Sequence, residues 1–275
     1  MLNQTDYIYS NPESEQPEGN NLIPFINYQS PAPKRCLDML LAKYKGERYQ
    51  SEVIMTSPEA SPVPRLHCRM SEATILLITD GGLVPKGNPG KIPSTNAGRY
   101  GVYSIEGKKS LISEEYEVSH QGYDNTYVEE DPNRLLPVDI LREMEAEGRI
   151  GKLYDVFLST AGVMTSAERS VRLGRQIAAF ALSHPIDAVI LTSACGTSTK
   201  CGAYIGMEIE EKGIPVVQVT NLVRISADTG ISRFVKGSNV CYPYGQPSLP
   251  PRQEYQYRRQ MVEETLRSLE EFPKE

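Results

Sequence analysis

The stretch from Asp187 to Gly202 constrains the fold of this 275-residue chain more than any other. Its first part, residues 188–191, is an unbroken and largely β-branched apolar run, typical of a strand buried on both faces of a sheet. Residues 192–200 are small and hydroxylated, and helical character follows after Cys201. The pattern therefore predicts a strand, a turn that carries Cys195, and a helix.

The predicted place of Cys195 has a chemical consequence. Open α/β folds bind ligands at the carboxyl edge of the parallel sheet, where helix amino termini offer free N–H groups and partial positive charge. A thiolate is stabilised at such a position and becomes nucleophilic near neutral pH, with added hydroxyl donors from residues such as Thr197. Cys195 equally fits a small core residue that closes a strand, because free cysteine is among the most buried residue types. Position alone leaves both interpretations open.

The rest of the chain predicts an α/β fold with a parallel, Rossmann-like sheet flanked by helices. Apolar runs over residues 74–79, 153–158 and 214–220 predict further strands, and the alternating residues 100–105 predict an exposed or edge strand. Predicted helices cover residues 137–147, 165–183 and 252–270, the second opened by a capping box of Thr165 and Glu168. Residues 223–250, rich in Gly and Pro, predict a loop. Alternating strands and helices require crossovers that bring the strand-end loops to one edge.

Three regions follow from composition along the chain. Residues 1–32 are rich in Asn, Gln, Glu, Ser and Pro and predict a disordered arm. Residues 33–72 predict a short amphipathic helix and an extended, proline-containing connector. Residues 73–275 form the predicted α/β domain.

Composition also narrows the class of protein. The formal net charge of -6, without a basic stripe, gives no support for nucleic-acid binding. The sequence has no apolar run long enough for a membrane span, and its first residues lack the apolar run of a secretory signal. We therefore expect a cytoplasmic location. The five cysteines are scattered and lack zinc-site spacing, so we expect neither a disulfide framework nor a metal site.

Two other loops carry candidate binding residues. The strand over 74–79 opens into a glycine loop in which Lys86 and Asn88 either hold a substrate carboxylate or serve as turn residues. His120, close to Asp124, either orients a substrate and moves a proton or is satisfied by the backbone of a turn. The predicted substrate contacts are Gly81, Gly82, Asn88, His120, Asp124 and Thr197.

With these segments in view, the chain resembles the selenoprotein subunit of component B of glycine, sarcosine and betaine reductases and, more distantly, the selenoprotein of D-proline reductase. The resemblance covers only the carboxyl-terminal part of the longer family protein. It runs in order from about residue 35 to the end and is carried by segments 79–89, 120–124, 130–139, 150–153 and 187–202. Where the family has Sec-Gly-Thr-Cys-Thr-Arg-Cys-Gly, this chain has Cys195 in place of selenocysteine, Ser198 in place of the middle cysteine, and Cys201 retained.

The resemblance implies reductive cleavage of a C–N bond in a small amine or amino acid, with Cys195 as nucleophile and Cys201 as candidate resolving thiol. It implies no cofactor on this chain, but a pyruvoyl group on a partner subunit that binds the amine. A thioredoxin-like or selenoprotein A-like carrier is the implied acceptor of electrons or product.

Two other hypotheses stay open. The Cys195 loop also resembles that of cofactor-independent amino-acid racemases, which use two facing cysteines, so that Cys201 or Cys241 would have to lie across a pocket. Alternatively, the chain is a non-catalytic assembly subunit that kept the fold and lost the selenium chemistry.

Overall fold

The computed structural model describes residues 26–50, 52 and 63–271, in two units that comprise residues 1–56 and 57–275. The first unit contains the expected short helix, α1 (Ala32–Lys45), which ends at Gly46 in the left-handed conformation (φ 70°). Most of the arm predicted over residues 1–32, and residues 53–62 of the connector, lie outside the described residues. The predicted domain boundaries stay predictions.

The described part of the second unit is built on a six-stranded sheet in the order β3-β5-β1-β6-β7-β8. Its strands, in chain order, are β1 (Thr74–Thr79), β3 (Gly101–Ser104), β5 (Lys152–Ser159), β6 (Ala188–Thr192), β7 (Val216–Thr220) and β8 (Phe234–Lys236). All neighbouring pairs are parallel except β3 and β5, which are antiparallel. The predicted parallel, Rossmann-like sheet is therefore confirmed, and its central strands β1 and β6 are almost wholly buried, as their apolar runs predict.

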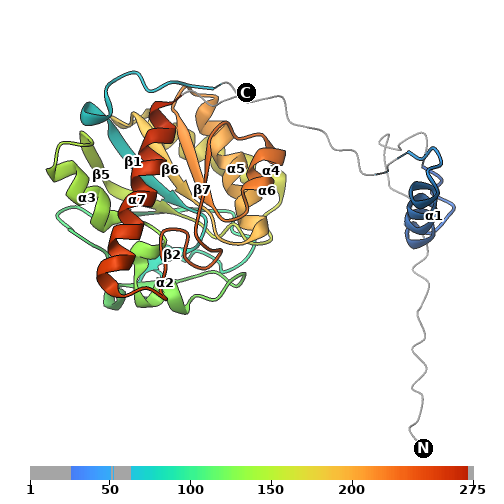
Figure 1. The fold of residues 1–275 in the computed structure, drawn as a ribbon, viewed down its shortest axis with the longest axis horizontal. Helices are drawn as coiled ribbons and strands as arrows, with labels where there is room; N and C mark the ends of the chain where they lie inside the picture. The colour runs from blue at the N-terminus through green and yellow to red at the C-terminus, as the bar shows by residue number, and fades with distance from the viewer. Residues whose placement is uncertain (1–25, 51, 53–62, 272–275) are drawn as a thin grey trace, which may run out of the picture. The chain divides into compact units, whose positions relative to one another are not determined.

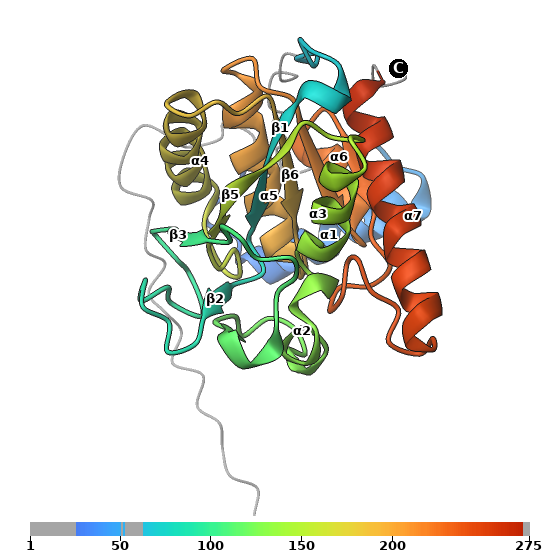
Figure 2. The same cartoon turned by 90° about the vertical axis from the view of Figure 1, so that its left-hand side faces the viewer.

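A smaller sheet pairs β2 (Leu83–Pro85) with β4 (Tyr116–Val118) in antiparallel register. It lies beyond the carboxyl end of β1, near α2 (Thr126–Glu130), as Figures 1 and 2 show. Three short 3₁₀ helices cover Met70–Glu72, Ser113–Glu115 and Pro132–Arg134. Apart from β3, which belongs to the main sheet, the segment between Leu83 and Glu130 forms a cover over the loop edge of that sheet.

Helices bury both faces of the main sheet. Alternate residues of β1 face opposite ways: Ile75 and Leu77 join one core cluster and Leu76 and Ile78 join the other. The first cluster contains residues of α3 (Val138–Ala146) and α7 (Pro251–Glu270), and the second contains residues of α4 (Ala167–Leu182) and α5 (Gly196–Glu210). Figure 2 shows these two pairs of helices on opposite sides of the strands.

The long helix α7 is fixed by a buried network of charged side chains. Arg258 pairs with Asp131 and Asp139, which precede and begin α3. Arg134 pairs with Glu254 one turn before Arg258, with Nε to Oε1 at 2.9 Å. The segment 130–139 that supports the family resemblance therefore anchors the carboxyl-terminal helix.

Three predicted boundaries were wrong. Helix α5 begins at Gly196, not after Cys201, because Ser and Thr residues are readily accommodated in a first turn. Ser166, not Thr165, caps α4, since its Oγ accepts from the Arg169 N–H at 3.3 Å. The loop predicted over 223–250 contains α6 (Val223–Thr229) and β8, whose tertiary pairing with β7 a short segment does not reveal.

In the part of the chain that the structure describes, every helix is too short or too polar to cross a membrane. The cytoplasmic location stays a prediction.

Candidate functional site

The carboxyl ends of three central strands meet, as their glycine- and hydroxyl-rich loops predict. The Asp80 N–H donates to the carbonyl of Thr192 at 3.1 Å, and the Gly162 N–H donates to the carbonyl of Asp80 at 2.9 Å. A further bridge joins Gly81 to Ala161. The loops after β1, β5 and β6 therefore form one continuous surface beside the amino terminus of α5.

Cys195 is the N-cap residue of α5. The side chain is half-buried, and its sulfur lies 3.4 Å from Ser198 Oγ and 3.6 Å from Thr197 Oγ1. The first turn of the helix leaves N–H groups without intrahelical partners, which favours negative charge at this end. Because α5 starts at Gly196, the sulfur is closer to this end than the predicted boundary implied.

His120 reaches the same turn from the loop after β4. Its ring is buried (1% exposed), and Nε2 lies 2.7 Å from Ser198 Oγ. The Gly122 N–H donates to Nδ1 at 3.0 Å. Burial lowers the pKa of His120 to about 4, so the ring is neutral at physiological pH. The imidazole thus contacts the site through Ser198 and has no recorded hydrogen bond to Asp124.

Two glycines allow these loops to approach the thiol. A Cβ at Gly122 would lie 3.0 Å from Cys195 Sγ and 2.8 Å from His120 Cε1. A Cβ at Gly162 would lie 2.8 Å from the Cα of Ser198. Side chains at these two positions would collide with the site, so glycine is what brings the 119–125 and 160–164 loops against α5.

The remaining predicted binding residues have structural partners. Gly81 accepts a hydrogen bond on its carbonyl from Tyr123 Oη at 2.8 Å. Gly82 adopts a left-handed conformation (φ 76°), and a Cβ there would lie 2.3 Å from the Ser119 carbonyl oxygen. Both glycines shape the cover over the sheet edge. A role in substrate binding stays a prediction for them.

Asn88, Asp124 and Thr197 differ in their surroundings. Asn88 bonds the backbone of Ile92 through both ends of its amide, and so acts as the turn residue that the sequence allowed. Asp124 is exposed, and its Oδ1 accepts from the Thr126 N–H at the start of α2. Thr197 is exposed beside Cys195 and accepts from the Met164 N–H at 3.0 Å. Of the three, Thr197 is the one that the structure places next to the thiol.

Beneath the thiol lies a fully buried polar cluster. Ser193 Oγ donates to Asp80 Oδ2 at 2.5 Å, and Gln218 Nε2 donates to Ser193 Oγ at 2.8 Å. Burial raises the pKa of Asp80 well above its ordinary value, which favours its neutral form. A Cβ at Gly202 would lie 2.3 Å from Asp80 Oδ2, so this glycine lets α5 pack directly on the cluster.

Cys201 is buried (1% exposed) in the second turn of α5, among the apolar residues packed against α4. Burial raises the pKa of its thiol to about 12. Six residues of α-helix rise about 9 Å along the axis, whereas the Cα atoms of a disulfide lie within about 6.8 Å. A Cys195–Cys201 disulfide would therefore require the first turns of α5 to unwind. The resolving role of Cys201 stays a prediction with that condition.

The racemase hypothesis requires a second thiol that faces Cys195. Cys201 does not meet this requirement, because it is buried within the helix packing. Cys241 is half-buried in the loop after β8, and both it and Cys195 raise the pKa of the Tyr123 hydroxyl, after the larger effect of burial. Cys241 is therefore the thiol that this hypothesis would have to use.

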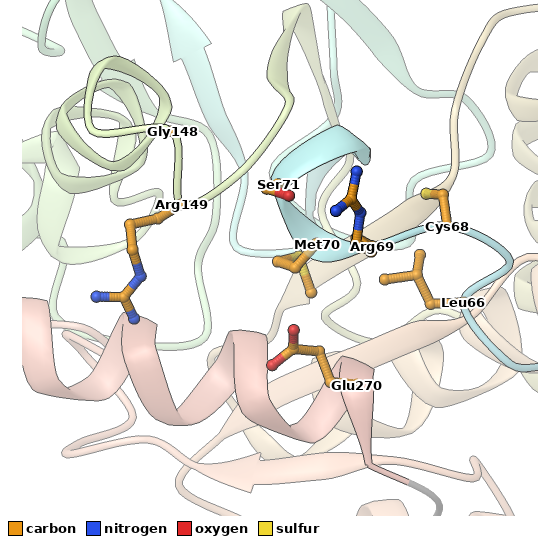
Figure 3. A pocket seen from close by; sticks show the side chains of 8 residues that line it. All are labelled: Leu66, Cys68, Arg69, Met70, Ser71, Gly148, Arg149 and Glu270. Atoms are coloured by element: carbon orange, nitrogen blue, oxygen red, sulfur yellow. The ribbon is translucent and has the colours of Figure 1, made fainter.

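A hollow of about 490 Å³ lies elsewhere, at the amino edge of the sheet (Figure 3). Its lining comes from the segment before β1, the segment before β5 and the end of α7, and includes Met70, Arg149 and Glu270. None of the predicted site residues lines it. The chemistry of Cys195 thus belongs to the opposite edge, where parallel strands end and α5 begins.

The sequence indicated Ser198 as a hydroxyl donor near Cys195 and as the replacement for the middle cysteine, but not its contact with His120. The roles of Tyr123 and Asp80 were missed. Ser198 follows Cys195 by three residues, which would have placed it in the first helical turn had the start of α5 been predicted correctly. Tyr123 and Asp80 lie in segments 120–124 and 79–89, which carry the family resemblance, but their contacts were not predicted because they depend on loops that are distant in sequence.

Comparison with known proteins finds relatives for most of the chain. The sequence profile of the family described as glycine/sarcosine/betaine reductase selenoprotein B matches residues 7–194, and so ends directly before Cys195. Glycine reductase complex component B subunit gamma of Carboxydothermus hydrogenoformans is 47% identical over 236 residues, or 86% of this chain and 54% of that protein. Sarcosine reductase complex component B subunit beta of Peptoclostridium acidaminophilum is 37% identical over 237 residues, with the same coverage.

A further relative is matched over nearly its whole length. D-proline reductase subunit gamma of Acetoanaerobium sticklandii is 28% identical over 240 residues, which is 85% of this chain and 92% of that protein. The chain spans about half the length of the component B relatives, whereas no solved structure matches it. Because the family profile covers more than half of the chain, and the relatives carry the same family's names, this protein belongs to the glycine/sarcosine/betaine reductase selenoprotein B family.

Proposed function

We propose that this chain supplies the thiol nucleophile of a reductase complex that cleaves the C–N bond of a small amine or amino acid. One observation carries the proposal: the half-buried residue Cys195 lies at the amino terminus of α5, on the carboxyl edge of a parallel sheet. The names of the relatives, which are components of glycine, sarcosine and D-proline reductases, supply the reaction class.

In the proposed reaction the Cys195 thiolate attacks the carbon that bears the nitrogen. A C–S bond forms as the C–N bond breaks, and the bonding electron pair leaves with the nitrogen, which takes up a proton as the amine departs. A selenol or thiol of a carrier protein then displaces the Cys195 thiolate from the carbon, which restores the site. The thiolate is the attacking group in the first step and the leaving group in the second. The residues beside the sulfur stabilise it in both steps.

The proposal includes partners. A separate subunit would hold the amine, through a pyruvoyl group in the amino-acid-processing case, as the family resemblance implies. A thioredoxin-like or selenoprotein A-like protein would accept the product. The exposed surface around Thr197 and Cys195 is where both would have to reach the sulfur.

The chain contains its own control for thiol activation. Cys36 is exposed in the second turn of α1, beyond the first turn in which the helix terminus acts. At pH 7 we expect iodoacetamide to alkylate Cys195 about tenfold faster than Cys36, despite the lower exposure of Cys195. Peptide mass spectrometry of samples quenched over time measures both rates in one molecule. Equal or slower reaction of Cys195 would instead favour the assembly-subunit hypothesis.

Turnover tests the reaction itself. In the complex purified with its partner subunits, Cys195→Ser should abolish amine release from the substrate, and Cys36→Ser should leave it intact. Cys241→Ser should also leave amine release intact. The racemase hypothesis differs here, because only a racemase reaction needs a second thiol that faces Cys195. Amine release by the Cys195→Ser complex would refute the nucleophile assignment.

A further inference from the structure

The hydroxyl of Ser198 lies between the imidazole of His120 and the sulfur of Cys195. It is fully buried, 2.7 Å from His120 Nε2 and 3.4 Å from Cys195 Sγ. The three groups come from two segments, the loop after β4 and the first turn of α5. This arrangement forms one chain of hydrogen bonds that ends on the reacting atom.

The backbone determines which nitrogen of His120 carries the proton. The Gly122 N–H donates to Nδ1, so Nδ1 presents a lone pair, and the proton of the neutral ring is on Nε2. Nε2 therefore donates to Ser198 Oγ. Nε2 already carries this proton and has no free lone pair, so it cannot take a proton from Ser198. A second proton could go only to Nδ1, which would break the hydrogen bond from Gly122 and place a charged ring in a buried site. The geometry is that of an orienting donor and not of a general base.

The thiol and the thiolate use Ser198 differently. With the thiol protonated, Cys195 Sγ donates to Ser198 Oγ, which then accepts from both neighbours and leaves its own proton without a recorded acceptor in the described residues. When the thiol loses its proton, the sulfur becomes an acceptor, and the Ser198 hydroxyl can donate to it. Both donors of this three-residue series, His120 Nε2–H and the Ser198 hydroxyl, then have an acceptor. The hydrogen bonding therefore favours the thiolate over the thiol.

Among residues 26–50, 52 and 63–271, the titratable groups shown to interact with Cys195 are acids and supply no positive charge. Asp80 after β1, Tyr123 in the 119–125 loop and Cys201 in α5 interact electrostatically with its sulfur. Burial raises the pKa of each of these three groups, which favours their neutral forms. Stabilisation of the thiolate thus falls to the amino terminus of α5 and to hydroxyl donors, of which Ser198 is the nearest at 3.4 Å.

We propose that neutral His120 is a positioning residue, which fixes the Ser198 hydroxyl as a hydrogen-bond donor to the Cys195 thiolate. The serine takes the place of the middle cysteine in the related motif, and its hydroxyl supplies part of the activation that a thiol needs and a selenol does not. This role rests on the proposed function, in which Cys195 is the reacting group.

The test measures the pH profile of iodoacetamide alkylation at Cys195 in the full chain, by peptide mass spectrometry. Ser198→Ala and His120→Leu should each move its midpoint upward by about one pH unit, so that alkylation at pH 7 falls about tenfold. His120→Gln, which retains an N–H donor at a similar reach, should restore most of the reactivity. His184→Leu is the matched control, because His184 contacts Phe180 at the far end of α4.

A double-variant cycle tests whether His120 acts on Cys195 through Ser198 or the two residues act independently. The Ser198→Ala/His120→Leu protein should show no larger shift than Ser198→Ala alone, because His120 acts through the hydroxyl. Unshifted midpoints, additive shifts, or a Gln variant as slow as the Leu variant would overturn the proposal. Circular dichroism checks folding, and if His120→Leu does not fold, Ser198→Ala and His120→Gln decide the test. Alkylation needs no partner subunit, so the positioning role of His120 can be confirmed even if reductase turnover is absent. Failure of the positioning role and failure of the proposed function are therefore distinguishable.

Discussion

Replacement of Arg258 by Leu tests how the carboxyl-terminal helix is held. The Arg258 side chain is 4% exposed, and its guanidinium contacts Asp139 Oδ2 at 2.5 Å and also pairs with Asp131. Burial raises the pKa of Asp131, but the Arg258 charge and hydrogen bonds outweigh it and hold that pKa below its ordinary value. Burial dominates at Asp139, whose pKa is raised even beside Arg258. Arg258→Leu would leave both carboxyls without their shared cation.

We expect Arg258→Leu to lower the free energy of unfolding by about 3–5 kcal/mol, as when one partner of a buried ion pair is removed. The next residue provides the control. Arg259 pairs with Glu143 and Glu147 at the surface, where its side chain is 25% exposed. Arg259→Leu should therefore cost at most about 1 kcal/mol. Urea denaturation followed by circular dichroism measures both variants.

The loss should depend on pH. Because the folded pKa of Asp131 lies below the unfolded value of about 3.9, the pair contributes stability above that pH and loses it as the pH falls. The difference between wild type and Arg258→Leu should thus be largest near pH 7 and shrink below about pH 4. Adding Asp139→Asn should recover part of the stability by removing one unpaired carboxyl. Equal losses for the Arg258 and Arg259 variants, or a loss that pH does not change, would refute the reasoning.

Two further predictions concern buried groups of the site. Cys201 is 1% exposed and its thiol pKa is raised to about 12, so it should resist alkylation at pH 8 in the folded protein and react only after denaturation. Mass spectrometry of the labelled peptides measures this. Rapid labelling of the native protein would contradict it and indicate that α5 opens. His120, whose folded pKa of about 4 lies below the unfolded value of about 6.5, should reduce stability by up to about 3 kcal/mol as the pH falls from 6.5 to 4. His120→Gln should flatten that part of the stability profile in urea titrations, and an unchanged slope would contradict the burial argument.

Most of the sheet was predictable because its strands carry their signal locally. β1 was predicted at its observed bounds, Thr74–Thr79, since a strand buried on both faces must be a continuous apolar run. β8 and α6 were not predicted, because a three-residue strand and a seven-residue helix are too short to show a period. The prediction of a turn at Cys195 placed the thiol at the correct edge but misplaced the start of α5.

The candidate site divides in the same way. Cys195, Thr197 and His120 stood out as residue types with known chemistry beside glycine turns. The contact of His120 with Ser198, 78 positions away, was not visible in the sequence, whereas a turn role for Asn88, whose amide bonds Ile92, was one of the two roles that the sequence allowed. The local sequence pattern indicates which residues are reactive. Their contacts depend on which loops the sheet brings together.

The sequence by itself determined the α/β class, the buried central strands and a cysteine at a strand end, because apolar periodicity and turn composition act over a few neighbouring residues. Only the tertiary structure decided that this cysteine caps α5, that Cys201 is buried, and that neutral His120 reaches the thiol through Ser198. Those facts depend on the close approach of separate loops across glycines 122 and 162, and sequence spacing does not encode such contacts.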